Sequence, residues 1–304
     1  MLKDSIDTID RLTVICFSPT RTSRKIAEAV AAGMTGMSGG TAGYADALRQ
    51  IRTIDLTLDR SDEPIILNSG ETVVLGAPVY AGRVAPEAIR RLRRIQVAAG
   101  ASVPAVVTVT YGNRDYEDAL VELYDLAVLL GLSPFAAGAF IGEHSYSTPE
   151  MPVAEGRPDT LDLADARIFG GQCARKLDSS GAFAPFHIKG NRPYKEPSRP
   201  ASDTSHKASG ALTDGGPAKT APAVPSVPMT ADGCPLCGEC VAVCPTGAVS
   251  IDLNARKVLT DPALCIRCCA CVRACPAGLR TYTTPFTAFL HEHCSARRDP
   301  ETFL

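Results

Sequence analysis

The chain has 304 residues, a formal net charge of −2 and 45% hydrophobic residues. This length exceeds that of one typical domain, so we expect two. The near-neutral charge gives no reason to expect nucleic acid or an anionic membrane as partner, and no apolar run approaches the ~20 residues that span a bilayer. The acidic start, MLKDSIDTIDRL, does not predict a secretory signal, so we expect a cytoplasmic protein.

The first predicted elements are a strand and a helix. Residues 12–17 form an apolar run typical of a buried strand, and residues 24–33 have helical spacing with a closing glycine. The turn between them, SPTRTS, presents hydroxyls and free N–H groups at the positive end of the helix, which suits a phosphate. Ser or Thr would serve equally well as an ordinary helix cap. The local sequence leaves both interpretations open.

The strand-then-loop pattern returns at residues 71–82 and 103–113, and helical segments follow at 84–95 and about 115–131. This alternation predicts right-handed βαβ units and a doubly wound, mostly parallel α/β sheet with both faces covered. In such sheets ligands bind beyond the carboxyl ends of the strands, where these loops would converge. A flat aromatic ligand with a phosphate tail would fit there.

Aromatic and small residues lie in the second and third of these loops. Tyr80 and Tyr111 are candidates to hold a flat ring, and Tyr116 is a weaker one, because tyrosines in parallel-sheet proteins commonly belong to the core or its rim. Neighbouring backbone groups with little side-chain obstruction could contact the polar edge of the ring. These are the backbone groups of Ala81, Gly82, Gly112 and Asn113.

Charged residues near the loops have two interpretations. Arg83, Arg114 and His144 could reach the same mouth, but a surface or capping role is favoured for each. The basic run at 90–94 could attract an acidic redox partner, but a solvated helix face is favoured.

Residues 201–228 are rich in Ala, Ser, Thr, Gly and Pro and contain no aromatic residue. Such composition is typical of a flexible linker, which would let the flanking domains move relative to each other. Helical spacing returns at 284–298 and predicts a C-terminal helix that packs back. The predicted division is a front domain at 1–197, a linker at 198–229, a cysteine-rich domain at 230–283 and a helix with tail at 284–304.

Nine of the twelve cysteines lie between residues 234 and 276, in two C-x2-C-x2-C-x3-C-P motifs offset by 31 residues. This is the bacterial two-cluster ferredoxin pattern, in which each fourth cysteine ligates the opposite cluster. Zinc sites built from C-x2-C pairs would leave four of the eight cysteines without a role. The predicted ligands are Cys234, Cys237, Cys240 and Cys275 for the first [4Fe-4S] cluster and Cys265, Cys268, Cys271 and Cys244 for the second.

Four cysteines remain outside this ligand set. Cys269 would break the shared spacing if it replaced Cys268, so we interpret it as a packed thiol. Cys16 lies in a predicted strand, and Cys173 and Cys294 lie in predicted helices. We interpret these three as small hydrophobic residues.

Several stretches resemble a known family. The turn SPTRTS resembles the flavodoxin phosphate loop, Ser/Thr-x-Thr-Gly-x-Thr, which binds the phosphate of FMN. Residues 77–88, 110–123 and 188–197, the cysteine motifs and the C-terminal DPETFL are similar to fusion ferredoxins with an N-terminal flavodoxin-like domain. The resemblance implies FMN and two [4Fe-4S] clusters as cofactors. It implies an FMN site made of Ser18, Thr20, Arg21, Thr22, Ser23, Pro78, Tyr80, Ala81, Gly82, Tyr111, Gly112, Asn113 and Tyr116.

Arg21 departs from that family pattern, because flavodoxins have glycine there. If the position requires a positive φ, the arginine costs on the order of 1 kcal/mol. Its guanidinium could instead add a charged contact to the phosphate. Weak or absent FMN binding is a third outcome of the departure.

The combination predicts an electron-transfer protein that relays electrons between FMN, two clusters and external redox partner proteins. One alternative is a flavoenzyme that reduces a small molecule with the clusters as electron inlet, and another is an interaction module whose front domain has lost its flavin. No G-x-G-x-x-G follows a predicted strand, so direct use of a nicotinamide is unsupported.

Overall fold

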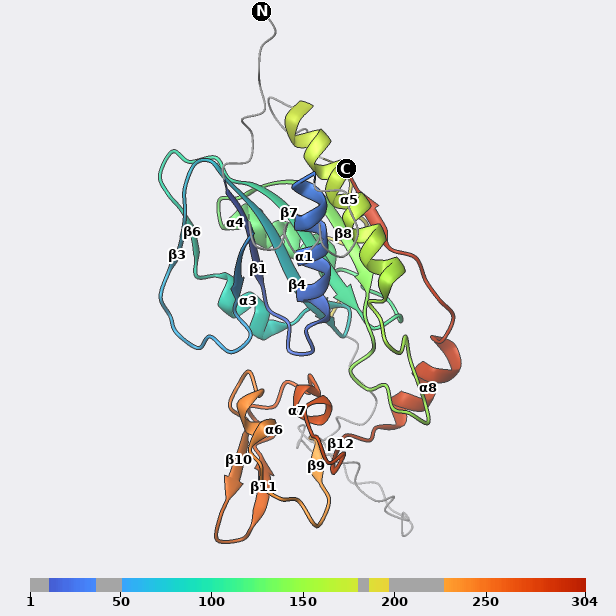
Figure 1. The fold of residues 1–304 in the computed structure, drawn as a ribbon. Helices are drawn as coiled ribbons and strands as arrows, with labels where there is room; N and C mark the ends of the chain where they lie inside the picture. Colours follow the sequence, from blue (N-terminus) through green and yellow to red (C-terminus); the bar gives the residue numbers. More distant parts are fainter. Residues whose placement is uncertain (1–10, 37–50, 180–185, 197–226) are drawn as a thin grey trace, which may run out of the picture.

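The computed structural model describes residues 11–36, 51–179, 186–196 and 227–304, drawn in colour in Figure 1. The predicted linker at 198–229 lies outside these residues except for its last three.

A twisted sheet forms the centre of the front domain. Its order is β13-β8-β7-β4-β1-β2, and the last five strands of that order pair in parallel. Numbered along the chain, these five have the order 2-1-3-4-5, which is the flavodoxin-like version of the doubly wound fold. The predicted α/β fold class is confirmed. The parallel strands are β1 (Arg11–Cys16), β2 (Arg52–Asp55), β4 (Glu71–Tyr80), β7 (Pro104–Tyr111) and β8 (Ser133–Ile141).

Helices cover both faces of the sheet and produce two hydrophobic cores (Figure 1). On one face lie α1 (Thr22–Met34) and α5 (Thr160–Ser179), and on the other α3 (Pro86–Leu92) and α4 (Ala119–Leu129). The strand residues alternate between these cores: Val14 and Val74 face α1 and α5, whereas neighbouring residues of the same strands face the other core. Helices α1 and α5 touch at their backbones, since a Cβ on Gly170 would lie 2.0 Å from the Val30 carbonyl oxygen.

Short strands extend the front domain beyond the predicted pattern. Strand β5 (Arg83–Val84) pairs antiparallel with the end of β4, and β3 (Ile65–Leu67) pairs in parallel with β6 (Ile95–Val97). The predicted helices at 84–95 and 115–131 are confirmed in place but are shorter. Of the residues predicted as helix, Ile95 instead begins β6, where it is buried and pairs with Ile65.

The cysteine-rich domain is a pseudo-symmetric pair of halves. Two antiparallel strand pairs support the cysteine loops. One pair is β9 (Met229–Thr230) with β12 (Arg280–Thr281), and the other is β10 (Val249–Asp252) with β11 (Lys257–Thr260). Each motif contains one four-residue helix, and these two are α6 (Glu239–Ala242) and α7 (Ala270–Arg273).

The C-terminal segment returns to the front domain. The predicted C-terminal helix is α8 (Pro285–His293), capped by the Thr284 hydroxyl, which accepts a hydrogen bond from the Phe286 amide. A strand that the sequence did not predict, β13 (Glu301–Phe303), then pairs antiparallel with β8 at the sheet edge. Figure 1 shows this segment running from the cysteine-rich domain along the side of the sheet to the C-terminus. We call residues 284–304 the C-terminal strap.

Candidate cofactor sites

A cavity of ≈ 470 Å³ opens at the carboxyl ends of β4, β7 and β8, beside the start of α1. This position is the one at which doubly wound sheets bind ligands, and the volume is that of a typical small-molecule site. Eight of the predicted FMN residues line it. They are Thr20, Thr22, Pro78, Tyr80, Ala81, Gly82, Tyr111 and Gly112.

The turn SPTRTS had two interpretations, a helix cap and a phosphate site, and its hydroxyls are distributed between them. Ser18 caps the helix, because its hydroxyl accepts a hydrogen bond from the Arg24 amide at 3.0 Å. Thr20 and Thr22 face the cavity with their hydroxyl oxygens 3.3 Å apart. The helix start therefore uses one hydroxyl for itself and presents two others, with the positive end of α1, to a ligand.

Arg21 has the left-handed conformation that glycine provides in flavodoxins, with φ 65°. Its side chain is exposed and does not line the cavity. Two further non-glycine residues with positive φ, Ala81 and Asn113, lie in the loops after β4 and β7. The loop after β7 also holds Glu117, with φ 43°. Each of the three loops thus holds at least one residue in the left-handed region, at a cost of about 1–2 kcal/mol each.

Four other predicted FMN residues lie away from the cavity wall. The Ser18 and Ser23 side chains are buried in and beside α1, and the Tyr116 side chain belongs to the core, where its hydroxyl donates to Glu301 at 2.8 Å. The Asn113 amide donates to the carbonyl oxygens of Cys294 and Ala296 at 2.6 and 2.7 Å. Asn113 and Tyr116 therefore fasten the C-terminal strap.

The cavity contains polar groups without a partner in the described part of the chain. The hydroxyls of Thr110 and Tyr111 are buried, and no hydrogen bond satisfies them there. An orphaned buried hydroxyl is costly. These two oxygens are themselves covered, so the fit to a flavin rests on the wall that faces the cavity: the hydroxyls of Thr20 and Thr22 for a phosphate, and Tyr80, Tyr111 and Tyr146 for a flat ring.

Many residues that line the large cavity were not among the predicted FMN residues. The loop after β8 contributes His144 and Tyr146, the strap contributes Phe286 and Phe289, and the cysteine-rich domain contributes Ile266 together with Arg267. The sequence analysis placed His144 at this mouth but favoured a surface or capping role for it. It also predicted that the C-terminal helix packs back, but not that the helix would line this cavity. Burial, helped by the charges of Arg114 and Arg273, lowers the pKa of His144 to about 4. Its imidazole is therefore neutral at pH 7.

Two smaller cavities lie in the cysteine-rich domain. Cys234, Cys237, Cys240 and Cys275 line the first, which we call the first cysteine cavity. Cys244, Cys265, Cys268 and Cys271 line the second, which we call the second cysteine cavity, together with Cys269. In both, the fourth cysteine comes from the opposite motif.

Among the described residues, no three His, Cys, Asp or Glu side chains converge on a point suitable for a single metal ion. A cubane has a different requirement, because its four thiolates bind four separate irons around a void. Four thiols around each cavity fit that requirement. Cys269 also lines the second cysteine cavity, but its thiol donates a hydrogen bond to the Arg267 carbonyl oxygen at 3.7 Å.

One residue lines both the large cavity and the second cysteine cavity. Ile266 lines both. Tyr80 lies close to the same boundary: burial raises the pKa of its hydroxyl well above the usual value, and the thiols of Cys268 and Cys269 add to the rise. The first cysteine cavity shares no lining residue with the large cavity. It includes the exposed Cys237.

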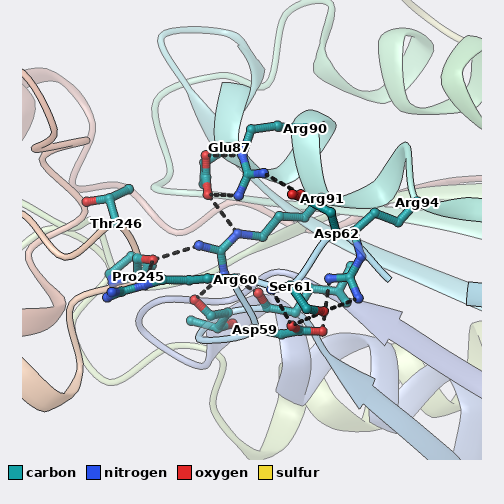
Figure 2. A network of polar contacts seen from close by, with 12 residues as sticks. Asp59, Arg60, Ser61, Asp62, Glu87, Arg90, Arg91, Arg94, Pro245 and Thr246 are labelled. Atoms are coloured by element: carbon teal, nitrogen blue, oxygen red, sulfur yellow. Dashed lines mark hydrogen bonds and ion pairs between the residues drawn. The ribbon is translucent and has the colours of Figure 1, made fainter. Parts of the chain in front are cut away.

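Two arginines of the front domain bind the backbone next to Cys244 (Figure 2). Arg60 donates to the carbonyl oxygens of Cys244 and Pro245 at 2.7 and 3.1 Å. Arg91 donates to the Pro245 carbonyl at 2.6 Å and to the carbonyls of Leu56 and Thr57, and Glu87 balances its charge at 2.7 Å. We call Arg60 and Arg91 the arginine clamp.

This geometry corrects the predicted solvated helix face for one residue of the basic run. Arg91 is only 1% exposed, since it points into the domain interface, whereas Arg93 is exposed. The run therefore contacts another domain of its own chain. Helical spacing could not reveal this, because the interdomain acceptor is a backbone carbonyl 154 residues away in the sequence.

The C-terminal strap and the second motif add further interdomain contacts. Arg273 forms an ion pair with Glu143 at 2.9 Å and donates to the His144 carbonyl oxygen at 3.0 Å. Arg298 donates to the Arg114 carbonyl oxygen at 2.5 Å. The structure thus holds the two domains together through side-chain and strand contacts, and the linker is not their only connection.

The charged residues weighed as substrate ligands have partners inside the chain. Arg83 forms a bidentate ion pair with Glu122 at 2.6 and 2.9 Å and does not line the cavity. Arg114 lines it, but its guanidinium pairs with Glu117 at 2.5 Å. The His144 Nδ1 accepts a hydrogen bond from the Tyr146 amide at 3.0 Å. These contacts favour structural roles.

Comparison with protein families identifies residues 233–279 as a 4Fe-4S dicluster domain. A search of curated proteins finds no match. Among solved structures, a flavodoxin from the domain Archaea is similar at 11% identity over 55% of this chain and 99% of that one, with a TM-score of 0.33. A flavodiiron core, Flv1 from Synechocystis sp. PCC6803, is similar at 15% identity over 56% of this chain and 36% of that one, with a TM-score of 0.35.

The rubredoxin:oxygen oxidoreductase of Desulfovibrio gigas is similar at 11% identity over 56% of this chain and 36% of that one, with a TM-score of 0.33. The flavodoxin-like assignment of the front domain rests on its strand order. The chain therefore joins a flavodoxin-like domain to a 4Fe-4S dicluster domain, an architecture that supports a role in electron transfer. None of the described helices has the length and apolar character needed to cross a membrane.

Proposed function

We propose that the chain is an electron-transfer protein that relays electrons between FMN in the large cavity, two [4Fe-4S] clusters and an external redox partner protein. The observation that carries the proposal is the position of Ile266, which lines both the large cavity and the second cysteine cavity. FMN exchanges one or two electrons and a cubane exchanges one, so together they connect the two kinds of carrier.

The protein's own residues have separable roles in this proposal. Thr20 and Thr22, at the start of α1, would bind the phosphate, and Tyr80 and Tyr111 would hold the ring. The clamp and the strap would keep the second cysteine cavity against the ring site. The exposed Cys237 marks the opposite end, where an external partner would approach the first cluster.

The flavoenzyme alternative receives less support from the same cavity. A substrate site needs free polar groups to orient the substrate. The two groups considered for this task, Arg114 and His144, are engaged with Glu117 and the Tyr146 amide. The carrier function therefore remains the better supported of the two.

The first test concerns composition. Anaerobic purification followed by iron, acid-labile sulfide and flavin analysis should give about eight irons, about eight sulfides and one FMN per chain, since two complete ligand sets are present. About four irons, or no flavin after reconstitution, would refute the corresponding half of the proposal.

The second test concerns the phosphate loop. Replacing Thr20 and Thr22 together with Ala should weaken FMN binding at least tenfold, because hydrogen bonds to a charged phosphate are worth about 1.5–3 kcal/mol each. Riboflavin, which lacks the phosphate, should bind almost as before. Ser23→Ala is the matched control, since that hydroxyl does not line the cavity. Equal loss for both flavins would reject the phosphate assignment.

The third test concerns the relay itself. After rapid reduction of the clusters, flavin absorbance should change at a rate independent of protein concentration in the full chain. Removing residues 299–304 deletes β13 and should slow this transfer by loosening the docked arrangement. A rate that rises with concentration in the intact chain would mean that the two centres serve separate partners.

A further inference from the structure

The two cysteine motifs have the same backbone conformation at equivalent positions. Left-handed residues recur at the offset of 31: Leu236 and Arg267 have φ 58° and 56°, and Gly247 and Gly278 have φ 72° and 64°. The equivalence extends through the segment that follows each fourth cysteine. At this offset Arg280 is equivalent to Val249. Arg280 lines the first cysteine cavity, and Val249 lines the second.

Arg280 is a buried cation without a counter-ion. Its side chain is 2% exposed, and its two terminal nitrogens donate to the neutral hydroxyls of Thr230 and Thr260 at 2.8 and 2.6 Å. Its Nε is buried and has no hydrogen-bond partner among the described residues. No ion pair among the described residues includes Arg280, so no carboxylate of that part of the chain compensates its charge.

An uncompensated buried charge is strongly unfavourable. Arg280 nevertheless lies at the wall of the first cysteine cavity, beside Cys234, Cys237, Cys240 and Cys275. The acidic residue of the same wall, Glu239, is exposed, and no ion pair joins it to Arg280 among the described residues. Four thiolates with their irons and sulfides carry net negative charge and would supply the missing counter-ion.

The second cysteine cavity differs in this respect. Its lining contains no charged side chain, and Val249 occupies the position equivalent to Arg280. Arg267, the cation between Cys265 and Cys268, lines the large cavity and not the second cysteine cavity. The arginine clamp reaches this half only through the backbone carbonyls of Cys244 and Pro245. Within the clamp, Arg91 is neutralised by Glu87 and Arg60 is exposed, which weakens the field of both.

We propose that Arg280 sets the reduction potential of the first cluster above that of the second, so that an electron shared by the two clusters resides mainly on the first, away from the flavin cavity. Reduction adds one negative charge to a cluster, and a nearby buried cation stabilises the reduced form more than the oxidised one. The inference rests on the proposed presence of both clusters.

The step it governs is a balanced one-electron transfer. The second cluster is oxidised by one electron and the first is reduced by the same electron, with no proton or bond exchanged. An external one-electron reductant, or the flavin, supplies the electron. Arg280 therefore acts as a positioning residue through its charge, and it holds the electron where the exposed Cys237 faces a partner.

The test is a redox titration of the full-length protein with reconstituted clusters, followed by electron paramagnetic resonance and by the shifted proton signals of the cysteine ligands. Arg280→Met removes the charge and keeps the length. It should shift the electron-sharing equilibrium toward the second cluster at least tenfold, which corresponds to 59 mV for one electron. The second cluster's potential should stay unchanged, and Arg280→Lys should retain most of the wild-type difference.

Arg256→Met is the matched control, because Arg256 is an exposed arginine of the same domain. If Arg280→Met loses the first cluster, Arg280→Gln, which keeps a hydrogen-bond donor without charge, replaces it in the titration. Unchanged potentials in the neutral variants, or a loss in Arg280→Lys equal to that in Arg280→Met, would overturn the proposal. Wild-type protein with only four irons would instead reject the proposed function, so the two failures are distinguishable.

Discussion

The two halves of the cysteine-rich domain share a ligand pattern and a backbone but differ in their neighbours. Cys244, Cys268 and Cys271 around the second cysteine cavity are buried, and the front domain contacts this half. Around the first cysteine cavity Cys237 is exposed. The repeated residues build two equivalent sites, and the unrepeated ones, such as Arg280 and Ile266, make the sites different. The spacing of the cysteines alone would predict two interchangeable clusters.

The largest expected effect is the loss of one cluster when one of its cysteine ligands is removed, which tests each half separately. Cys275→Ala should damage the cluster of the first cysteine cavity, and Cys244→Ala that of the second, because each fourth cysteine lies with the opposite motif. Iron analysis should show loss of up to half of the iron in each variant. Electron paramagnetic resonance would identify which cluster remains.

Cys294→Ala is the matched control, since Cys294 lies outside both cavities. If Cys275→Ala damaged only the cluster of the second cysteine cavity, the cross-ligation would be wrong. Each cluster would then be held by the four cysteines of a single motif.

The next effect tests the contact that distinguishes the second half. Arg91→Met should destabilise the folded chain by about 2–5 kcal/mol, because it removes the guanidinium that donates to the Leu56 and Thr57 carbonyl oxygens. Glu87 and the Pro245 carbonyl lose one donor each and keep Arg90 and Arg60. Chemical denaturation measures this loss. Arg93→Met, a change in an exposed arginine of the same helix region, should have little effect.

Arg91→Met should also slow the transfer between flavin and clusters, because Arg91 is half of the interdomain clamp. A stability loss with an unchanged transfer rate would mean that the C-terminal strap alone maintains docking. The roles of clamp and strap would then be separated.

A smaller, pH-dependent effect is expected where the second motif meets the β8 loop. The pKa of His144 is about 4 in the folded chain, compared with 6.5 for an unburied histidine. Between these values the unfolded chain binds a proton that the folded chain does not, so stability should fall as pH decreases from about 6.5 to 4 and stop falling below that. His144→Asn should flatten this part of the stability curve measured by denaturation. An unaltered curve would show that other groups cause the acid sensitivity.

The sequence predicted the elements that local patterns specify. The strand at 12–17, the helix at 24–33 and the paired motifs were recognisable because periodicity and spacing are short-range signals. The same logic predicted the loops of the large cavity, since the carboxyl ends of parallel strands share one edge. Eight of thirteen predicted FMN residues consequently line it.

What the sequence did not predict depends on long-range contacts. Strand β13 has three residues and acquires its conformation only by pairing with β8, so its local sequence contains too little signal. Arg91 was interpreted as a surface residue because its partners are backbone carbonyls, which every residue has. Tyr116 and Asn113 lie in a predicted ligand loop, yet their side chains hold the strap instead.

The smallest expected effect is a change in the free energy of unfolding at one equivalent pair of residues, Gly238 and Cys269. Both begin the short helix of their half in the left-handed conformation, with φ 85° and 57°. Nothing lies within 4 Å of a Cβ built on Gly238, so Gly238→Ala should cost only the backbone strain, about 1 kcal/mol. Cys269→Gly should be more stable than Cys269→Ala by about the same amount, since both lose the thiol and only glycine relieves the strain. Denaturation of the four proteins, with iron analysis on each, measures both differences. If Cys269→Gly lost the second cluster while Gly238→Ala kept the first, the Cys269 thiol would have a role at the cluster, and the halves would differ in their ligands as well as their surroundings.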